Sequence, residues 1–326
     1  MKEITIGANE SGKRLDGFLA GILKEASKGF IYKMLRKKNI TLNGKKSDGK
    51  EKLSEGDVIR IFFSDETFEK MSGASDPAAQ PDFLGAKEKL GDLPVIYEDD
   101  HIVLVNKPAG VLSQRAEKKD ISLNEWLMEY LFEKGEVTSK SLETYRPSIC
   151  NRLDRNTSGL VICAKSLAGA RYMNELIRSR NVDKYYRTIV FGRLDKGLRL
   201  KGFLKKDEKS NKVTISDKDP KDVNYSYIET EYAPVRYLAD ADLTVLEIKL
   251  ITGKPHQIRA HLSGIGHPII GDIKYGGKSF MGLNYQLLHS YRLEFPADMK
   301  EPFKYLSGKK FIADLPPKFT EIMEKC

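Results

Sequence analysis

The chain has 326 residues, of which 40% are hydrophobic, and its formal net charge at pH 7 is +9. This length and composition suffice for one large domain plus a small one, with a packed core. Its three cysteines, Cys150, Cys163 and Cys326, are too few and too scattered for a disulfide framework or a cysteine-rich metal site. No segment approaches the roughly 18 apolar residues that a membrane span requires, so we expect a soluble, cytoplasmic protein.

A small domain is predicted over residues 1–64. One helix is expected to begin at residues 14–19, and a second helix to cover residues 27–38 with Ser27 as its cap. Strands are expected at residues 40–44 and 53–61. The side chains predicted on the buried side of the second helix are Ile31, Met34 and Leu35.

The small domain is basic. It has 14 Lys and Arg residues against 8 Asp and Glu residues, which gives +6. Such an excess favours a polyanionic partner, although a solvated helix face is the simpler alternative. The cations on the second predicted helix are Lys28, Lys33, Arg36, Lys37 and Lys38.

Residues 65–93 are predicted to be a flexible linker. They contain Gly-Ala-Ser-Asp-Pro-Ala-Ala-Gln-Pro at positions 73–81 and show no clear periodicity. The remaining segment, 94–326, mixes helix and strand patterns without a regular βαβ succession, so we expect an α+β fold with a predominantly antiparallel sheet. Its predicted elements are a hairpin over 95–105, strands at 160–163, 185–192 and 243–251, and a helix over 166–180.

One acid, Asp154, lies in a polar turn between short apolar segments, a setting that suits a nucleophile better than a core residue. Arg152 and Arg155 flank it, residues 156–158 can form hydrogen bonds within the turn, and Gly159 permits a positive φ or a close backbone approach. For an isolated Leu-Asp-Arg sequence, a local turn cap is the more common role.

A second polar motif, Thr-Gly-Lys-Pro-His at positions 252–256, is predicted to be a loop that enters a helix. If Arg259 on that helix folds against Asp154, its positive charge would favour the ionised carboxylate. The polar side chains of this motif either contact RNA or order the loop. They are Lys254, His256 and Gln257.

No metal or nucleotide cofactor is predicted. His256, His261, His267 and Asp272 lack the spacing of a zinc signature. The glycine-rich segment 271–279 resembles a phosphate loop superficially, but that loop requires glycine at the position of Asp272.

Three motifs together resemble the RluA/RluC/RluD group of ribosomal large-subunit pseudouridine synthases. They are the turn around Asp154, the sequence Lys-Tyr-Tyr at 184–186, and His-Gln-Ile-Arg at 256–259. The first 64 residues resemble an S4 domain, a small RNA-binding module, through Arg-Leu-Asp at 14–16 and the Lys-rich helix. The likeness covers most of the chain.

This resemblance implies that Asp154, Tyr186 and Arg259 are catalytic. A tyrosine can stack on the target base or assist proton removal, and an arginine can orient the aspartate. Tyr185 competes with Tyr186 for this role, because adjacent strand residues point to opposite faces. The residues then expected to contact RNA are Lys33, Arg36, Lys37, Lys38, Arg152, Arg155, Lys254, His256 and Gln257.

Two positions depart from the family pattern, which has His where this chain has Asn151 and Arg where it has Lys254. The function implied is isomerisation of specific uridines in large-subunit (23S-type) ribosomal RNA or its assembly particles, by a monomer without a cofactor. The alternatives are a non-catalytic RNA-binding or ribosome-assembly protein of the same fold, and a glycoside hydrolase, for which no second carboxylate is evident.

Overall fold

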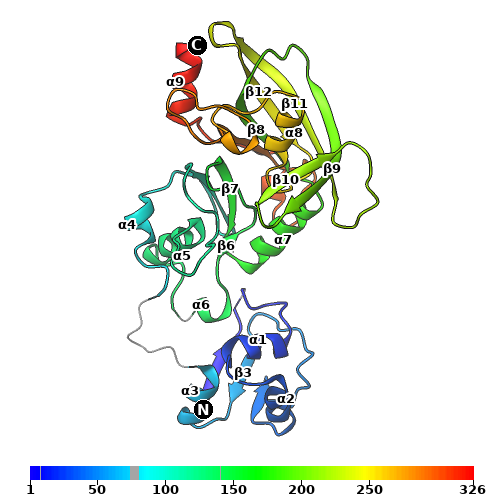
Figure 1. Ribbon diagram of the computed structural model, residues 1–326. Coiled ribbons are helices and arrows are strands. Elements are labelled where there is room, and N and C mark those ends of the chain that lie inside the picture. Colours follow the sequence, from blue (N-terminus) through cyan, green and yellow to red (C-terminus); the bar gives the residue numbers. More distant parts are fainter. Residues whose placement is uncertain (8, 74–80, 140) are drawn as a thin grey trace.

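The computed structural model describes residues 1–326 except 8, 74–80 and 140. A small N-terminal unit lies at one end of the molecule in Figure 1, and a larger unit with a long curved sheet forms the rest. Within the described residues, no helix is long and apolar enough to cross a membrane.

The small unit consists of a three-stranded antiparallel sheet, in the order β1-β3-β2, and three helices. The predicted second helix is confirmed: Ser27 caps it by accepting a hydrogen bond from the Phe30 amide at 3.2 Å. Its buried side chains are the three predicted. The elements are β1 (Lys2–Thr5), α1 (Leu15–Ile22), α2 (Lys28–Arg36), β2 (Ile40–Leu42), β3 (Val58–Ile61) and α3 (Asp65–Ser72).

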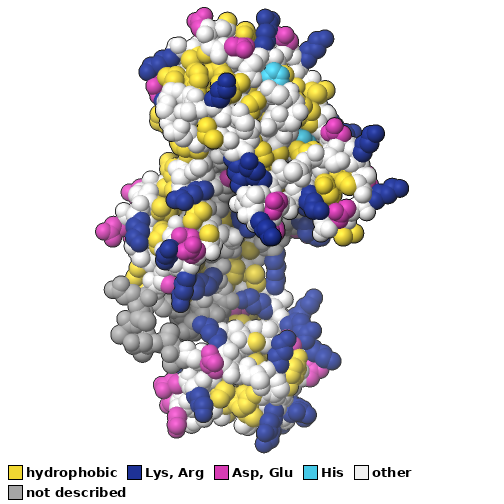
Figure 2. Space-filling model, in the orientation of Figure 1, with side chains coloured by type: hydrophobic (Ala, Val, Ile, Leu, Met, Phe, Trp, Pro, Cys, Tyr) yellow, Lys and Arg dark blue, Asp and Glu magenta, His cyan; other side chains and the backbone are white. Residues whose placement is uncertain are grey.

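The strand predicted over 53–61 is shorter in the structure and begins at Val58. Gly56 has a φ of 85°, and its chain turns there before the strand starts. The outer side of α2 remains free of the core, because Lys33, Arg36, Lys37 and Lys38 are all exposed. Figure 2 shows Lys and Arg side chains gathered along this unit.

The predicted flexible linker over 65–93 has a short helix at each of its ends. α3 packs Phe68 and Met71 against the core of the small unit. Short helix α4 (Ala86–Leu90) contributes Ala86 to the core of the large unit, and Leu93 follows it there. Each segment buries too few apolar side chains to produce a recognisable period, and the middle of the predicted linker lies outside the described residues.

The large unit contains an 11-stranded sheet, within the described residues, whose main path is β10-β9-β11-β12-β8-β13-β7-β5-β4. Among the pairings between the described strands of this sheet, only that of β13 with β7 is parallel, so the predicted, predominantly antiparallel α+β fold is confirmed. Its strands are β4 (Val95–Glu98), β5 (Ile102–Lys107), β6 (Ser148–Ile149), β7 (Ser158–Ala164), β8 (Asp183–Phe191), β9 (Leu198–Asp207), β10 (Lys212–Ser216), β11 (Ser226–Leu238), β12 (Leu243–Leu250), β13 (Leu288–Glu294) and β14 (Lys310–Ile312).

The helices of the large unit cover both faces of this sheet (Figure 1). The hairpin β4–β5, the strands β7, β8 and β12, and the helix α7 all lie where the sequence predicts them, with shifts of a few residues at their ends. The helical elements are α5 (Leu123–Glu133), α6 (Ser141–Thr144), α7 (Leu167–Arg178), η1 (Ala239–Ala241), α8 (Gln257–Gly264), η2 (Ile273–Tyr275), η3 (Lys304–Leu306) and α9 (Pro317–Lys325).

Strand β7, which directly follows the turn around Asp154, is buried over its whole length. Alternate residues enter two different cores, with Val161 and Cys163 packing on the side of α5 and Leu160 and Ile162 on the side of α7. This two-sided packing follows from the period of two in a strand. It gives the turn a rigid base.

Candidate active site

Asp154 lies in the tight turn between β6 and β7, where its carbonyl accepts a hydrogen bond from the Thr157 amide at 3.0 Å. Gly159, at the start of β7, has a φ of 110°. A Cβ atom there would lie 2.2 Å from the carbonyl oxygen of Ser290 in β13. Both properties expected of Gly159 are therefore confirmed, and only glycine fits this position.

The segment after β5 fixes the backbone on both sides of Asp154. The Ser113 hydroxyl donates to the Leu153 carbonyl at 2.8 Å and accepts from the Leu153 amide at 3.0 Å. On the other side, the Gly110 amide donates to the Arg155 carbonyl at 2.9 Å, and Arg155 Nε donates to the Gly110 carbonyl at 3.1 Å. The carboxylate of Asp154 projects between these anchors with 28% of its side chain exposed.

Lys107 supports the same turn from inside the protein. It is fully buried, and its ammonium group donates to the carbonyls of Pro108, Val111 and Arg155 at 2.8–3.1 Å. Burial lowers the pKa of Lys107 to about 7, although the negative charge of Asp154 acts to raise it. The three carbonyl acceptors match the three N–H groups of a charged amine, so they oppose the effect of burial.

Arg259 reaches the carboxylate from the first turn of α8. Its NH1 donates to Asp154 Oδ2 at 3.1 Å. The opposite edge of the guanidinium forms a bidentate pair with Asp272, from Nε to Oδ2 at 2.7 Å and from NH2 to Oδ1 at 2.8 Å. Since Asp272 is 1% exposed and Arg259 is 6% exposed, this pair is held in one geometry.

His256 and Tyr275 complete this side of the site. His256 is the N-cap of α8 in a left-handed conformation, and its Nε2 lies 3.8 Å from Asp154 Oδ2. Its Nδ1 is hydrogen-bonded to the Tyr275 hydroxyl at 2.8 Å. The Tyr275 ring lies under the Arg259 guanidinium, 4.9 Å from ring centroid to Cζ. Burial lowers the pKa of His256, which favours a neutral imidazole beside the carboxylate.

Tyr186 and Tyr185 point to opposite faces of β8. Tyr186 is buried, with 6% of its surface exposed, and pairs with Ser290 in the sheet. Burial raises the pKa of Tyr186 to about 12, and the charge of Asp154 contributes to this rise. The Tyr185 ring is covered by Arg292, whose Cζ is 4.0 Å from the centroid. Of the two rings, Tyr186 therefore shares the electrostatic environment of Asp154.

Other residues predicted to contact RNA have different surroundings. Arg152, Arg155 and Lys254 are exposed at the surface. Gln257 is 2% exposed, and its amide binds Thr252 Oγ1, the Lys254 amide, the Glu229 carbonyl and Thr230 Oγ1. The side chain of Gln257 therefore orders the loop, which is the second of the two roles predicted for it, and its contact with RNA stays a prediction.

Asn151, which replaces the histidine of the family pattern, also has a structural contact. Its Oδ1 accepts a hydrogen bond from the Ile162 amide of β7 at 2.8 Å. No group of three His, Cys, Asp or Glu side chains that could hold a metal ion is found in the described part of the chain. The supporting residues that sequence reasoning missed are Lys107, Ser113, Asp272 and Tyr275.

The buried amine gives a pH-dependent prediction for Lys107→Met. The folded-state pKa of about 7 lies below the ordinary value of 10.5, so the unfolded chain binds more protons between these pH values. The free energy of unfolding of the wild type should therefore rise with pH relative to the variant, by up to about 1.4 kcal/mol per pH unit. Urea denaturation of both proteins at pH 7, 8 and 9 measures this difference. A constant difference across the three pH values would contradict the lowered pKa.

Comparisons with known proteins show which family the chain is similar to. Residues 101–264 match the family model described as RNA pseudouridylate synthase. The chain is 31% identical over 304 residues to the ribosomal large subunit pseudouridine synthase C of Vibrio vulnificus (strain CMCP6), covering 90% of this chain and 87% of that protein. It is 30% identical over 309 residues to the protein of the same name from Escherichia coli (strain K12), covering 90% and 88% of the two chains. The solved structure of human RNA pseudouridylate synthase domain containing 4 is similar in fold, with a TM-score of 0.59, 21% identity, and coverage of 75% of this chain and 96% of that one.

Proposed function

The chain belongs to the RNA pseudouridylate synthase family, and on this premise we propose that it isomerises specific uridines of large-subunit ribosomal RNA with Asp154 as the catalytic carboxylate. The chain is thus an RNA pseudouridine synthase. The catalytic role of Asp154 and the choice of large-subunit ribosomal RNA as substrate are what we propose. The observation that carries the proposal is the contact of Asp154 with Arg259, which Asp272 fixes from behind.

The reaction breaks the bond from ribose C1′ to uracil N1, turns the base, and forms a bond from C1′ to C5. The C5 proton leaves and N1 gains a proton, so the product is an isomer and no redox step is needed. An ionised, fixed carboxylate can assist by adding covalently or by accepting a proton. Asp154 is held in such a position: Arg259 NH1 donates a hydrogen bond to it at 3.1 Å, and 28% of its side chain is exposed and can meet a substrate.

We assign Tyr186 to the uracil ring. With its pKa raised to about 12, its phenol stays protonated at neutral pH and is a poor proton acceptor. Stacking on the base and hydrogen-bond donation are the roles that this environment supports. Arg259 acts as the orienting cation of Asp154, because two of its N–H groups are already bound to Asp272.

Two basic surfaces support an RNA substrate. The first is the exposed side of α2, in the unit that resembles an S4 domain. The second, which the sequence reasoning missed, is the β9–β10 hairpin, whose segment 196–221 has nine Lys and Arg residues against four Asp and Glu residues. The hairpin joins the site directly, because the Val213 amide donates to the Tyr275 hydroxyl at 2.9 Å. Phosphate contacts on these surfaces would make binding salt-dependent.

The Ser113 hydroxyl should affect catalysis through the position of Asp154. In Ser113→Ala both hydrogen bonds to Leu153 are lost, and we expect kcat to fall about tenfold to a hundredfold with KM little changed. Initial rates of pseudouridine formation measure both constants. Thr244→Val is a matched control, since Thr244 is also buried, donates to the Gly192 carbonyl at 2.7 Å, and accepts from the Leu194 amide at 3.1 Å.

Both variants should lose thermal stability to a similar degree, because each leaves buried backbone groups unpaired. Only Ser113→Ala should lose kcat. Equal kcat values for the two variants would show that Ser113 does not position the carboxylate.

The proposed substrate class is tested with transcripts of large-subunit and small-subunit ribosomal RNA. The purified protein should form pseudouridine in the large-subunit transcript, or in large-subunit particles, at few positions. Carbodiimide labelling followed by primer extension locates these positions. Equal modification of both RNAs would contradict the large-subunit assignment, and binding without modification would favour the non-catalytic alternative.

A further inference from the structure

An open cavity of about 510 Å³ lies beside the turn around Asp154. Its walls come from the end of α4, the segment 110–112 that follows β5, the loop 116–121, and Arg155. A volume of this size is sufficient for a nucleotide-sized ligand. Arg155 is the residue next to Asp154, with Cα atoms about 3.8 Å apart, so the cavity adjoins the turn that carries the proposed catalytic residue.

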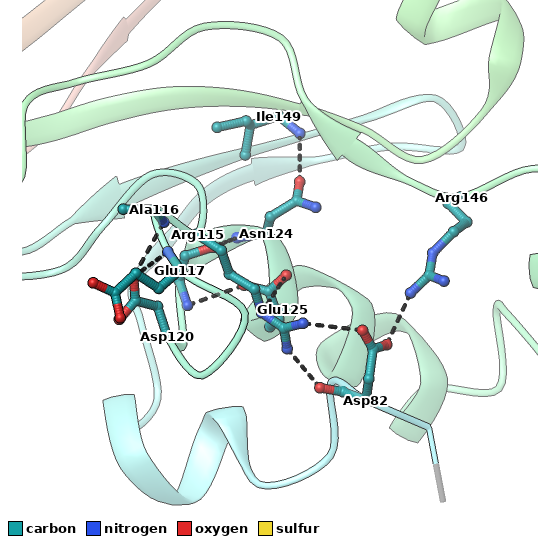
Figure 3. Close-up of polar contacts among 10 residues, drawn as sticks. Asp82, Arg115, Ala116, Glu117, Asp120, Asn124, Glu125, Arg146 and Ile149 are labelled. Atoms are coloured by element: carbon teal, nitrogen blue, oxygen red, sulfur yellow. Dashed lines mark hydrogen bonds and ion pairs between the residues drawn. The ribbon is translucent and has the colours of Figure 1, made fainter. Parts of the chain in front are cut away.

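Ion pairs hold the residue before the loop 116–121, as Figure 3 shows for Arg115. Arg115 binds Asp82 through NH1 to Oδ2 at 3.0 Å and through NH2 to the Asp82 carbonyl at 2.6 Å. Arg115 Nε also lies 3.2 Å from Glu125 at the start of α5. Arg146 NH2 binds the other oxygen of Asp82 at 3.1 Å. These contacts tie the residue before the loop 116–121 to Asp82 and to the start of α5.

Within the same loop, the carboxylate of Asp120 binds the backbone. Asp120 Oδ2 accepts from the amides of Ala116 and Glu117, at 3.1 and 2.8 Å (Figure 3). This use of Asp120 reduces its capacity to repel a bound anion. Glu117 is paired with Lys119 at 3.1 Å, and since their side chains are 66% and 83% exposed, the pair contributes little.

The lining suits one nucleotide of a single strand. Exposed cations at its rim can pair with a phosphate, while partly buried aliphatic side chains can contact a base or sugar. Arg155 donates one of the five N–H groups of its guanidinium to the Gly110 carbonyl. Its other N–H groups can donate to a phosphate. The cations are Lys89, Lys119 and Arg155, and the aliphatic residues are Leu90, Val111, Leu112 and Ile121.

We propose that this cavity binds a nucleotide that adjoins the target uridine in the RNA, with Lys119 and Arg155 at its phosphate. The inference rests on the proposed function. A target base must leave its stack to reach Asp154, and its neighbours along the strand are then unstacked as well. A second contact for such a neighbour, one residue from Asp154, holds the strand while the base turns.

Adjacent lysines allow a matched test, because Lys118 is exposed but does not line the cavity. Lys119→Glu and Lys118→Glu change the net charge equally. We expect Lys119→Glu to raise KM for ribosomal RNA about fivefold to tenfold and to reduce the salt slope of binding by about 1, with kcat unchanged. Lys118→Glu should stay within about twofold of the wild type, and Glu117→Gln should lower KM.

A cross-linking experiment locates the contact. Large-subunit transcripts carrying 4-thiouridine at random uridine positions are bound, irradiated and digested, and the cross-linked peptides are identified by mass spectrometry. Peptides from segment 110–121 should carry nucleotides within two positions of a pseudouridine site. Cross-links from this segment to distant nucleotides would overturn the proposal.

The possible results distinguish failure of the cavity proposal from failure of the proposed function. If the wild type forms pseudouridine but Lys119→Glu behaves as Lys118→Glu does, the cavity proposal fails and the proposed function stands. If Lys119→Glu weakens binding to ribosomal particles but not to naked RNA, the cavity binds an acidic protein segment and the proposal is wrong. If the wild type forms no pseudouridine on any ribosomal RNA, the proposed function itself fails.

Discussion

Asp154→Asn is expected to lower the rate of pseudouridine formation by about 10⁴-fold or more, as for the loss of a catalytic nucleophile or base. The amide has nearly the shape of the carboxylate, and its oxygen can still accept the hydrogen bond from Arg259 NH1. It cannot, however, add to the sugar or accept a proton. Single-turnover reactions, digested to nucleosides and separated by chromatography, measure the product directly.

The same variant should bind ribosomal RNA with an affinity within a few-fold of the wild type, because the basic surfaces on α2 and the β9–β10 hairpin are unchanged. Its melting temperature should also change little. Retention of a few per cent of the wild-type rate would mean that Asp154 is not the reacting group, and that a positional role in the turn explains it.

Arg259→Met is expected to destabilise the protein by about 3–5 kcal/mol, because it leaves the buried carboxylate of Asp272 without its partner. Activity should fall as well, since Asp154 loses its orienting cation. Urea denaturation and initial rates measure the two effects. Arg292→Met is the matched control: Arg292 pairs with Glu247 and Glu294 at 18–23% side-chain exposure, and its loss should cost about 1 kcal/mol.

A double variant separates the two roles of Arg259. In Arg259→Met with Asp272→Asn the unpaired charge is removed, so the loss of stability should be smaller than the sum of the single losses, by about 1–3 kcal/mol. The activity should not recover, because no cation then faces Asp154. Recovery of activity together with stability would show that Arg259 acts only through folding.

The sequence was informative where a local rule applies. Gly159 was expected to have a positive φ or a close neighbour, and the 2.2 Å approach to Ser290 explains why no other residue fits. The cap at Ser27 and the buried side of α2 followed from side-chain type and helical period. The class of fold could be predicted for the same reason, since strand and helix periods alternate without a βαβ order.

The support of Asp154 was not visible in the sequence. Asp272 is 13 residues beyond Arg259, and no periodicity marks a charged pair as buried, so its role appears only in three dimensions. Lys107 and Gly110 both donate hydrogen bonds to the Arg155 carbonyl, a contact between segments that are 45 or more residues apart in the chain. For Gln257 the sequence left two roles open, because a polar residue beside a basic loop can face solvent or the protein, and its hydrogen bonds in the structure are internal.

The two short helices within residues 65–93 could not be predicted from the sequence either. α3 and α4 are short and each packs few apolar side chains, against different cores. Asp82 then gains a function that composition cannot reveal, as the ion-pair partner of both Arg115 and Arg146. These ion pairs join segments that are far apart in the sequence, and the folded sheet brings those segments together.

Tritium release from large-subunit ribosomal RNA labelled at uridine C5 distinguishes catalysis by Asp154 from RNA binding alone. Formation of the new bond to C1′ must expel that hydrogen, so release reports on the chemistry itself. We expect release by the wild type, none by Asp154→Asn, and RNA binding by both. Tight binding without release by the wild type, on free RNA and on ribosomal particles, would contradict this expectation.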